Sequence, residues 1–358
     1  MAAAAVPETD VVETETEVIG RKKNVIPLLM FKDKNLTAIA TFERGMRFAA
    51  ASSAVEGTLI VNRVLAFVFR DGVAHGATDG DRPGDLFKVS KDTGYHVWSL
   101  DFDERGHRLA AGCSDARVRV WDLRRQYIDG SGFALTLSLS GHSDWVSGVM
   151  FGRKMFQDWI VSCSAYGGDR SIRVWKDEES TVICNDSLTH AIATHPQDDV
   201  FASGHEDHSV RIHKWGGGGG ESLVGHEGSV TCLVATMRFL ISGSADRTVR
   251  TWSWKSRACL GIFTTLSAPL GIHSLAVASG DSKIGELGSI VAVDKKEGAE
   301  RSHMKVWRGV RSPRDAPERT HEVSKVEQVH CMCARGVLVG TKSTIQLVIF
   351  DERHGEAH

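Results

Sequence analysis

Several features that would point to a common class of protein are missing from this sequence of 358 residues. No run of about 18 apolar residues is present, so the sequence predicts no membrane-spanning helix. The formal net charge is only -2, which leaves no excess of Lys and Arg for general binding to nucleic acid or to an anionic membrane. The N-terminus lacks the apolar segment of a secretory signal, so we expect a cytoplasmic or nuclear protein.

Cysteine is scarce, and its pattern does not indicate a disulfide framework. The sequence has seven cysteines, an odd number, which favours reduced thiols. The closest pair is Cys331 and Cys333, and no second Cys or His pair stands at zinc-ligand spacing. Alternate positions of a strand explain this pair better than a metal site does. The sequence therefore predicts no metal and no cofactor.

The N-terminal segment is poor in residues that could build a core. Residues 1–22 are rich in Ala, Glu, Thr and Val and contain no aromatic residue. Their acidity argues against a mitochondrial transit peptide, which is rich in Arg and poor in acidic residues. We expect residues 1–22 to form a disordered acidic tail.

A repeated pattern, with a period near 40 residues, dominates the rest of the chain. The clearest copy runs from Gly225 to Trp252 and reads GHEGSVTCLVATMRFLISGSADRTVRTW. A Gly-His dipeptide precedes three alternating segments separated by turn residues, which predicts three antiparallel strands. The turn Asp and the strand-ending Trp are six residues apart at Asp115 and Trp121, at Asp169 and Trp175, and at Asp246 and Trp252. A fourth copy keeps Asp207 but has His213 in place of the Trp.

These motifs, together with GHSDWVSGVMF, RVRVWDLR and SIRVW, resemble the WD-repeat family over roughly residues 24–353. The resemblance implies an all-β fold, a seven-bladed β-propeller of four-stranded antiparallel blades at residues 23–353, with a C-terminal tail at 354–358. Weaker copies are expected to form the first blade, the sixth, which ends at Trp307, and the seventh, in which Phe350-Asp351 replaces Trp-Asp. The segment KNVIPLLMFK is expected to complete the seventh blade and close the ring.

In this family a His, a strand Ser or Thr, the turn Asp and the Trp form a hydrogen-bonded chain inside a blade. The best matches here are His226, Ser242, Asp246 and Trp252. The chain is structural, because a buried indole, imidazole and carboxylate each need partners. Nucleophilic catalysis is not indicated, since the Ser lies in a strand and no G-x-S-x-G motif occurs. We therefore predict no catalytic residue and no enzyme.

The degenerate copy contains three histidines in the segment HEDHSVRIH. A metal site is one interpretation of this cluster. Strand alternation, however, places His205 and His208 around the turn and His213 at the far end of a strand, so we expect the three not to converge. Ordinary turn and strand histidines are the favoured interpretation.

Binding is expected on loops, because the strands are committed to pairing. By offset from the family pattern, the residues at the narrow top opening are His96, Trp145 and Ser229, joined by Ser114, Gly168, Glu206 and Ala245. Trp145 is the sharpest candidate, because aromatic side chains anchor many interfaces, although packing on a neighbouring loop is an equal alternative. The turn SCSAYGGDR is three residues longer than SGSADR and adds Tyr166 to this face.

Two longer insertions interrupt the repeats. Residues 70–86 are rich in Gly and Asp and are expected to be mobile. Residues 308–327 carry Arg308, Arg311, Arg314 and Arg319. This basic loop could contact RNA, a phosphate or an acidic partner, and Ser312 within it could be phosphorylated, but a solvated loop is the favoured interpretation.

The sequence supports three hypotheses of function. The first is a non-enzymatic scaffold for protein partners, without a membrane or a small-molecule substrate. The second is a substrate receptor of a cullin-RING ubiquitin ligase, because the ending Trp121-Asp122-Leu123-Arg124 resembles a family motif in which the Arg contacts the ligase adaptor. The third is RNA association through the basic loop 308–327.

Overall fold

The computed structural model describes most of the chain between residues 25 and 349. The described residues are 25–30, 34–42, 47–56, 59–70, 73–76, 95–124, 134–165, 168–184, 186–217, 220–264, 271–277, 290–294, 301–307, 319–324, 326–333, 336–341 and 344–349. Helix is almost absent from these ranges, which contain a short 3-10 helix at Lys154–Phe156. None of their helices has the length and apolar character needed to cross a membrane.

The strands form four-stranded antiparallel sheets, which confirms the predicted all-β class. Listed from one edge to the other, the sheets of the described residues are β2 (Lys34–Phe42), β3 (Arg47–Glu56), β4 (Leu59–Arg70) and β5 (Val73–Gly76); β6 (Val97–Phe102), β7 (Arg108–Cys113), β8 (Arg117–Asp122) and β9 (Ala134–Ser140); β10 (Val146–Phe151), β11 (Trp159–Ser164), β12 (Ser171–Lys176) and β13 (Glu179–Cys184); β14 (Thr189–Thr194), β15 (Val200–His205), β16 (Val210–Lys214) and β17 (Glu221–Leu223); β18 (Val230–Ala235), β19 (Phe239–Ser244), β20 (Thr248–Ser253) and β21 (Cys259–Thr264); β22 (Ile272–Val277), β23 (Ile290–Asp294), β24 (Arg301–Trp307) and β25 (Arg319–Ser324); and β26 (Val326–Cys333), β27 (Gly336–Thr341), β28 (Thr344–Ile349) and β1 (Val25–Met30).

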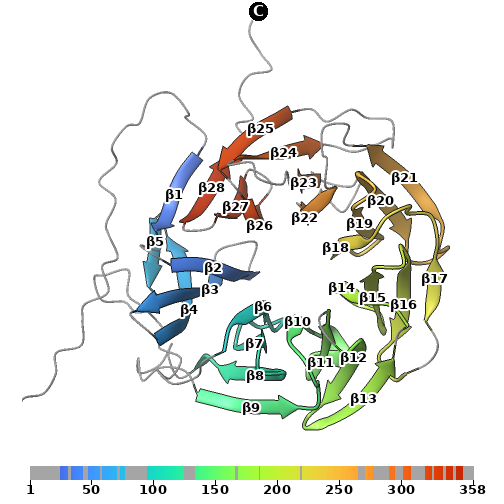
Figure 1. The fold of residues 1–358 in the computed structure, drawn as a ribbon, viewed down its shortest axis with the longest axis horizontal. Coiled ribbons are helices and arrows are strands. Elements are labelled where there is room, and N and C mark those ends of the chain that lie inside the picture. The colour runs from blue at the N-terminus through green and yellow to red at the C-terminus, as the bar shows by residue number, and fades with distance from the viewer. Residues whose placement is uncertain are drawn as a thin grey trace, which may run out of the picture.

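The sheets stand around a common centre, and the first strand of each lies innermost (Figure 1). Each innermost strand contacts the next, from β2 through β6, β10, β14, β18 and β22 to β26, and β2 also contacts β26. The strand β1, which lies in the segment KNVIPLLMFK, pairs antiparallel with β28, with Val25 opposite Val348. The two ends of the described chain thus share one sheet.

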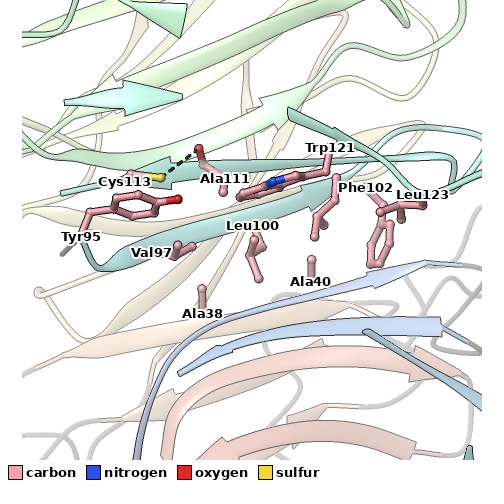
Figure 2. Packing of buried hydrophobic residues seen from close by; sticks show 11 residues of the cluster. Ala38, Ala40, Tyr95, Val97, Leu100, Phe102, Ala111, Cys113, Trp121 and Leu123 are labelled. Carbon is pink, nitrogen blue, oxygen red and sulfur yellow. Dashed lines mark hydrogen bonds between the residues drawn. The ribbon is translucent and has the colours of Figure 1, made fainter. Parts of the chain in front are cut away.

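Neighbouring sheets pack face to face through apolar side chains. Figure 2 shows the small residues Ala38 and Ala40 of β2 directed toward Leu100 and Phe102 of the next sheet. Trp121 of β8 is part of the same cluster and is 8% exposed. Apolar side chains from both sheets therefore fill the space between them, and their burial stabilises the fold by about 25 cal/mol per Å² of apolar surface.

A β-bulge interrupts the pairing of every innermost strand near its start, after the third pair in β2 and after the first pair in the other six. The register shifts between Leu36 and Ala38, Val97 and Ser99, Val146 and Gly148, Thr189 and Ala191, Val230 and Cys232, Ile272 and Ser274, and Val326 and Gln328. One extra residue therefore stands near the start of each of these strands. A bulge changes the direction in which that side chain points, and five of these residues line the centre of the molecule.

Two predicted loops contain strands, so these predictions were wrong in part. Within residues 70–86, Val73–Gly76 forms β5 and pairs with β4, because Asp71-Gly72 is a strong two-residue hairpin signal. Within residues 308–327, Arg319–Ser324 forms β25, the outer strand on β24, and Val326 begins β26. The segments 1–22, 308–318 and 354–358, together with Tyr166 and Phe350-Asp351, lie outside the described residues.

Candidate interaction surface

The sheet β18–β21 contains a row of hydrogen-bonded side chains that ends on a buried serine. His226 Nδ1 lies 2.8 Å from Asp246 Oδ2, and His226 Nε2 lies 2.7 Å from Ser242 Oγ. Trp252 donates from Nε1 to the same hydroxyl at 2.8 Å. Burial alone would raise the pKa of Asp246, but hydrogen bonds from His226, Thr248 and the backbone of Glu227 hold that pKa well below its ordinary value. The carboxylate therefore stays charged and anchors the row.

The sheet β10–β13 repeats this row with His142, Ser162, Asp169 and Trp175. The glycine before the histidine also has a defined place in both sheets. A Cβ at Gly225 would lie 2.5 Å from Arg250 Nη1, and a Cβ at Gly141 would lie 2.8 Å from Arg173 Nη1. An arginine of the third strand therefore lies over each glycine, and its guanidinium would have to move to admit a larger residue. The side chains of the two rows hydrogen-bond to one another inside their sheets, which indicates a structural role.

The three histidines of the sheet β14–β17 do not converge on one point, as predicted, but two of them meet at a serine. His205 Nε2 lies 2.7 Å from Ser203 Oγ, and His213 Nε2 lies 2.6 Å from the same atom. His205 and His213 therefore converge, whereas His208 is exposed in the turn. The alternation argument missed this pair because His213 has the position of Trp252 and reaches the serine as the indole does. Burial, followed by the charge of Arg211, lowers the pKa of each of the two histidines to about 4.

Trp145 lies at the end of β10 where the innermost strands begin, and it is 42% exposed. Its ring stacks on Trp98 of the neighbouring sheet, with ring centres 5.5 Å apart and an interplanar angle of 22°. His96 packs against the other tryptophan, Trp98, at 5.7 Å. Trp145 thus packs on a strand residue of the adjacent sheet and still presents much of its surface to solvent.

The other predicted surface residues lie in two local groups. Ser114 Oγ accepts a hydrogen bond from the backbone of His96 at 2.8 Å. Ser229 Oγ donates to the backbone oxygen of Glu206 at 3.4 Å, and the backbone N–H of Ala245 donates to the oxygen of Ser229. Gly168 and the side chain of Glu206 are exposed. The structure therefore links His96 with Ser114, and Ser229 with Glu206 and Ala245.

Sequence reasoning missed the bulge residues, which surround the centre. A cavity of about 650 Å³ is lined, among others, by Trp98, Ser147, His190, Thr231 and His273. These are the extra residues of five innermost strands. A bulge leaves no mark in the alternation of apolar residues, so the available signal was only that each of these residues is the second residue of its strand.

Arg124 follows β8, at the end of its sheet where β7 begins. Its side chain is 62% exposed, and its guanidinium donates to the carboxylate of Asp122, with Nε 3.0 Å from each oxygen. Leu123 between them is fully buried. The buried Leu123 and the ion pair fix the direction of an exposed cation. Within the described ranges, no group of three or more His, Cys, Asp and Glu side chains is placed to hold a metal ion.

Comparison with known proteins gives a consistent assignment. Residues 87–122, 133–176 and 220–253 match the family model of the WD domain, G-beta repeat. Striatin-4 of Mus musculus is 26% identical over 222 residues, which are 59% of this chain and 29% of the relative. Mitochondrial division protein 1 of Schizosaccharomyces pombe is 24% identical over 227 residues, 63% of this chain and 30% of the relative. Elongator complex protein 2 of Danio rerio is 31% identical over 156 residues, 40% of this chain and 17% of the relative.

The aligned region spans less than a third of the length of each of these relatives. The matched repeats are offset from the sheets by one strand. The second repeat covers β9 to β12, and the third covers β17 to β20, so each includes the outer strand of one sheet and three strands of the next. The three matched repeats, together with two of the hydrogen-bonded rows that the repeat pattern predicts, show that the chain contains WD repeats.

Proposed function

We propose that this chain is a closed, seven-bladed β-propeller that serves as a non-enzymatic scaffold for protein partners in a multiprotein assembly of the cytoplasm or nucleus. The pairing of β1 with β28 and the contact between β2 and β26 support the closed ring, because a ring leaves few strand edges free. Elongator complex protein 2 is, by its name, part of a complex, which agrees with such a role.

The observation that carries the docking site is the exposed, supported Trp145. An aromatic side chain with one face on Trp98 loses little conformational freedom when a partner covers the rest, and rigid aromatic residues dominate binding energy at interfaces. His96 and Ser114 extend the surface on one side. Ser229, Glu206 and the exposed Gly168 belong to the same end of the sheets, and Tyr166 is expected beside them.

Trp145→Ala should reduce partner capture at least fivefold while leaving the unfolding temperature within a few degrees of the wild type. The measurement is quantitative mass spectrometry of proteins captured by the tagged full-length chain. Met155→Ala is the matched control, because Met155 is 89% exposed at the other end of β10. Equal capture by the wild type and Trp145→Ala would refute the docking site. A large fall in the unfolding temperature of Trp145→Ala would show that Trp145 stabilises the fold by packing.

A second candidate function rests on Arg124. Its exposed guanidinium, held by Asp122, would be accessible to the adaptor of a cullin-RING ligase. In a pull-down, Arg124→Ala should lose the adaptor while the proteins that depend on Trp145 remain. Absence of the adaptor from the wild-type sample would end this candidate. RNA association has no comparable support, because Arg319 lies in strand β25 and Arg308, Arg311 and Arg314 fall outside the described residues.

A further inference from the structure

A patch of exposed apolar side chains lies on the outer rim of the sheet β18–β21. Leu260 and Ile262 of the outer strand β21 are 46% and 42% exposed. They alternate with Gly261 and Phe263, which are buried, so both point away from the core. Arg250 of β20 is the cross-strand partner of Ile262, and partners of this kind direct their side chains to the same face. The cation and the two apolar side chains therefore share one face of the sheet.

The guanidinium of Arg250 connects this face to a third exposed apolar residue. A Cβ at Gly225 would lie 2.5 Å from Arg250 Nη1, so the guanidinium lies against the backbone at this glycine. The preceding residue, Val224, is 81% exposed. We call Val224, Arg250, Leu260 and Ile262 the rim patch.

The cation of the rim patch lacks a counterion. Among the described residues, no ion pair or hydrogen bond joins Arg250 to another group, and its Nε is buried without a partner. The carboxylate of Asp246, four residues earlier, is instead bonded by His226 and Thr248. A guanidinium that is partly withdrawn from water and has no counterion favours an anionic ligand.

The sheet β10–β13 shows how the equivalent arginine is satisfied elsewhere. Arg173 Nη1 donates to Ser180 Oγ at 3.1 Å. Ser180 lies on the outer strand, opposite the tryptophan that ends the third strand, and β21 has Cys259 at this position. The hydroxyl that Arg173 uses is therefore replaced by a thiol in the sheet of Arg250.

The edge of β21 is suited to the addition of a further strand. It is the outermost strand of its sheet, and no strand of the described ranges pairs with its outer edge (Figure 1). Its sequence CLGIFT has no charged residue and no proline, whereas the outer strand β25 carries Arg319 and Glu322, and β17 has only three residues. Charges, proline and short length are common protections of a strand edge. The backbone of β21 therefore offers N–H and C=O groups to an extended segment of another chain.

From these contacts we infer that the rim patch binds an extended acidic peptide of a partner protein, which pairs with the edge of β21 and brings a carboxylate to Arg250 between aliphatic side chains. A polypeptide is required because the edge offers backbone hydrogen bonds along a strand. The carboxylate supplies the counterion that Arg250 lacks, and the aliphatic side chains cover Val224, Leu260 and Ile262.

This inference rests on the proposed scaffold role, but not on the docking site at Trp145, which belongs to another sheet. In the capture experiment, Arg250→Gln should retain the proteins that Trp145→Ala loses. The two sites can therefore fail separately.

Isothermal titration calorimetry of the full-length chain with the end-blocked peptide Ac-SVTETVS-NH2 tests the rim patch. The two valines and the glutamate of this peptide alternate with Ser and Thr, so they share one face of a strand. It should bind one-to-one. Arg250→Gln, or a peptide with Gln in place of Glu, should weaken binding about tenfold, and the two changes together should weaken it no further, because they remove the same pair. Ile262→Ser should weaken binding about fivefold.

Arg173→Gln and Val182→Ser are the matched controls. Arg173 and Val182 form the same cross-strand pair in β10–β13, and Val182 is also 42% exposed. Both variants should bind the peptide as the wild type does, and circular dichroism should show that every variant is folded.

Three results would overturn the inference: no saturable binding of the peptide, effects of Arg250→Gln and of the Gln peptide that multiply, or an equal loss of affinity in the control variants. Vesicles of phosphatidylserine and phosphatidylcholine test a membrane as the other source of negative charge. Vesicle binding that depends on Arg250, without peptide binding, would also overturn it.

Discussion

The sheets β18–β21 and β14–β17 have the same strand order and a serine at the same position, but they satisfy that serine with different side chains. Ser242 is bonded by His226 and Trp252, whereas Ser203 is bonded by His205 and His213. The serine hydroxyl is therefore the fixed element of the repeat. Any two ring nitrogens that reach it can complete the row.

The turn aspartates of the two sheets also differ in partner. Asp246 is held by His226, while Asp207 pairs with Arg211 and accepts a hydrogen bond from Ser209 Oγ at 2.6 Å. His226 stands four residues before its first strand, and the residue four before β14 is Asn185. The sheet β6–β9 follows the second arrangement, since Asp115 pairs with Arg119 at 2.6 Å. Where no histidine stands four residues before the first strand, an arginine of the third strand forms an ion pair with the turn aspartate instead.

Removal of the tryptophan from the row at Ser242 should have the greatest effect on stability. Trp252→Ala should lower the free energy of unfolding by about 3–5 kcal/mol, because it creates a cavity and leaves Ser242 with one partner. His213→Ala removes a smaller ring and should cost roughly half as much. Denaturant unfolding monitored by circular dichroism measures both changes. Equal losses of unfolding free energy would show that Trp252 and His213 contribute equally to stability, contrary to this prediction.

The two sheets should also respond differently to acid. His205 and His213 have a pKa of about 4 in the folded protein and an ordinary value of 6.5, so the unfolded chain binds more protons in this window. Stability is therefore lost as the pH falls from about 6.5 to about 4. Between pH 7 and pH 5, the wild type should lose about 2 kcal/mol more than His213→Phe. Parallel pH profiles of the two proteins would contradict this assignment.

The serines themselves test whether the hydroxyl is the common element. Ser242→Ala and Ser203→Ala should each cost about 1–3 kcal/mol, because both leave buried ring nitrogens without a partner. The comparison predicts similar values in the two sheets. A cost confined to Ser242→Ala, measured by thermal and denaturant unfolding, would mean that the histidine pair in β14–β17 is satisfied in another way.

The smallest difference is expected at the arginines. Arg211→Gln breaks the pair with Asp207, a partly exposed carboxylate, and should cost at most about 1 kcal/mol. The loss should shrink in 1 M salt, which screens exposed charges. Arg250→Gln has no aspartate pair to lose, and its stability should not depend on salt. A salt-dependent loss in both variants would remove the distinction between the two turns.

The fold class followed from the sequence because its signals are local. The six-residue spacing from Asp to Trp and the alternating segments predicted antiparallel strands, and the resemblance that these motifs carry implied four-stranded sheets and the row at His226. The β5 and β25 strands were missed because they are short or charged outer strands whose residues look like loop sequence. Outer strands are defined by their partner more than by their own pattern.

The features at the centre could not be derived in the same way. The stack of Trp145 on Trp98 joins two sheets, and the convergence of His205 and His213 depends on the reach of side chains across one sheet. The cavity depends on bulges, which alternation does not reveal. Local pattern therefore predicted the elements, whereas the candidate sites arise from contacts between elements.

The sequence repeat and the four-stranded sheet are different units of this chain, because their borders are offset by one strand. A duplication that copies residues such as 133–176 adds an outer strand to one sheet and three strands to the next, so no sheet can be gained or lost without its neighbour. Fragments cut at repeat borders would carry one incomplete sheet at each end, each with a bare edge. Any attempt to express part of this protein should therefore place its cuts after β9 or β17, which lie between sheets and inside matched repeats.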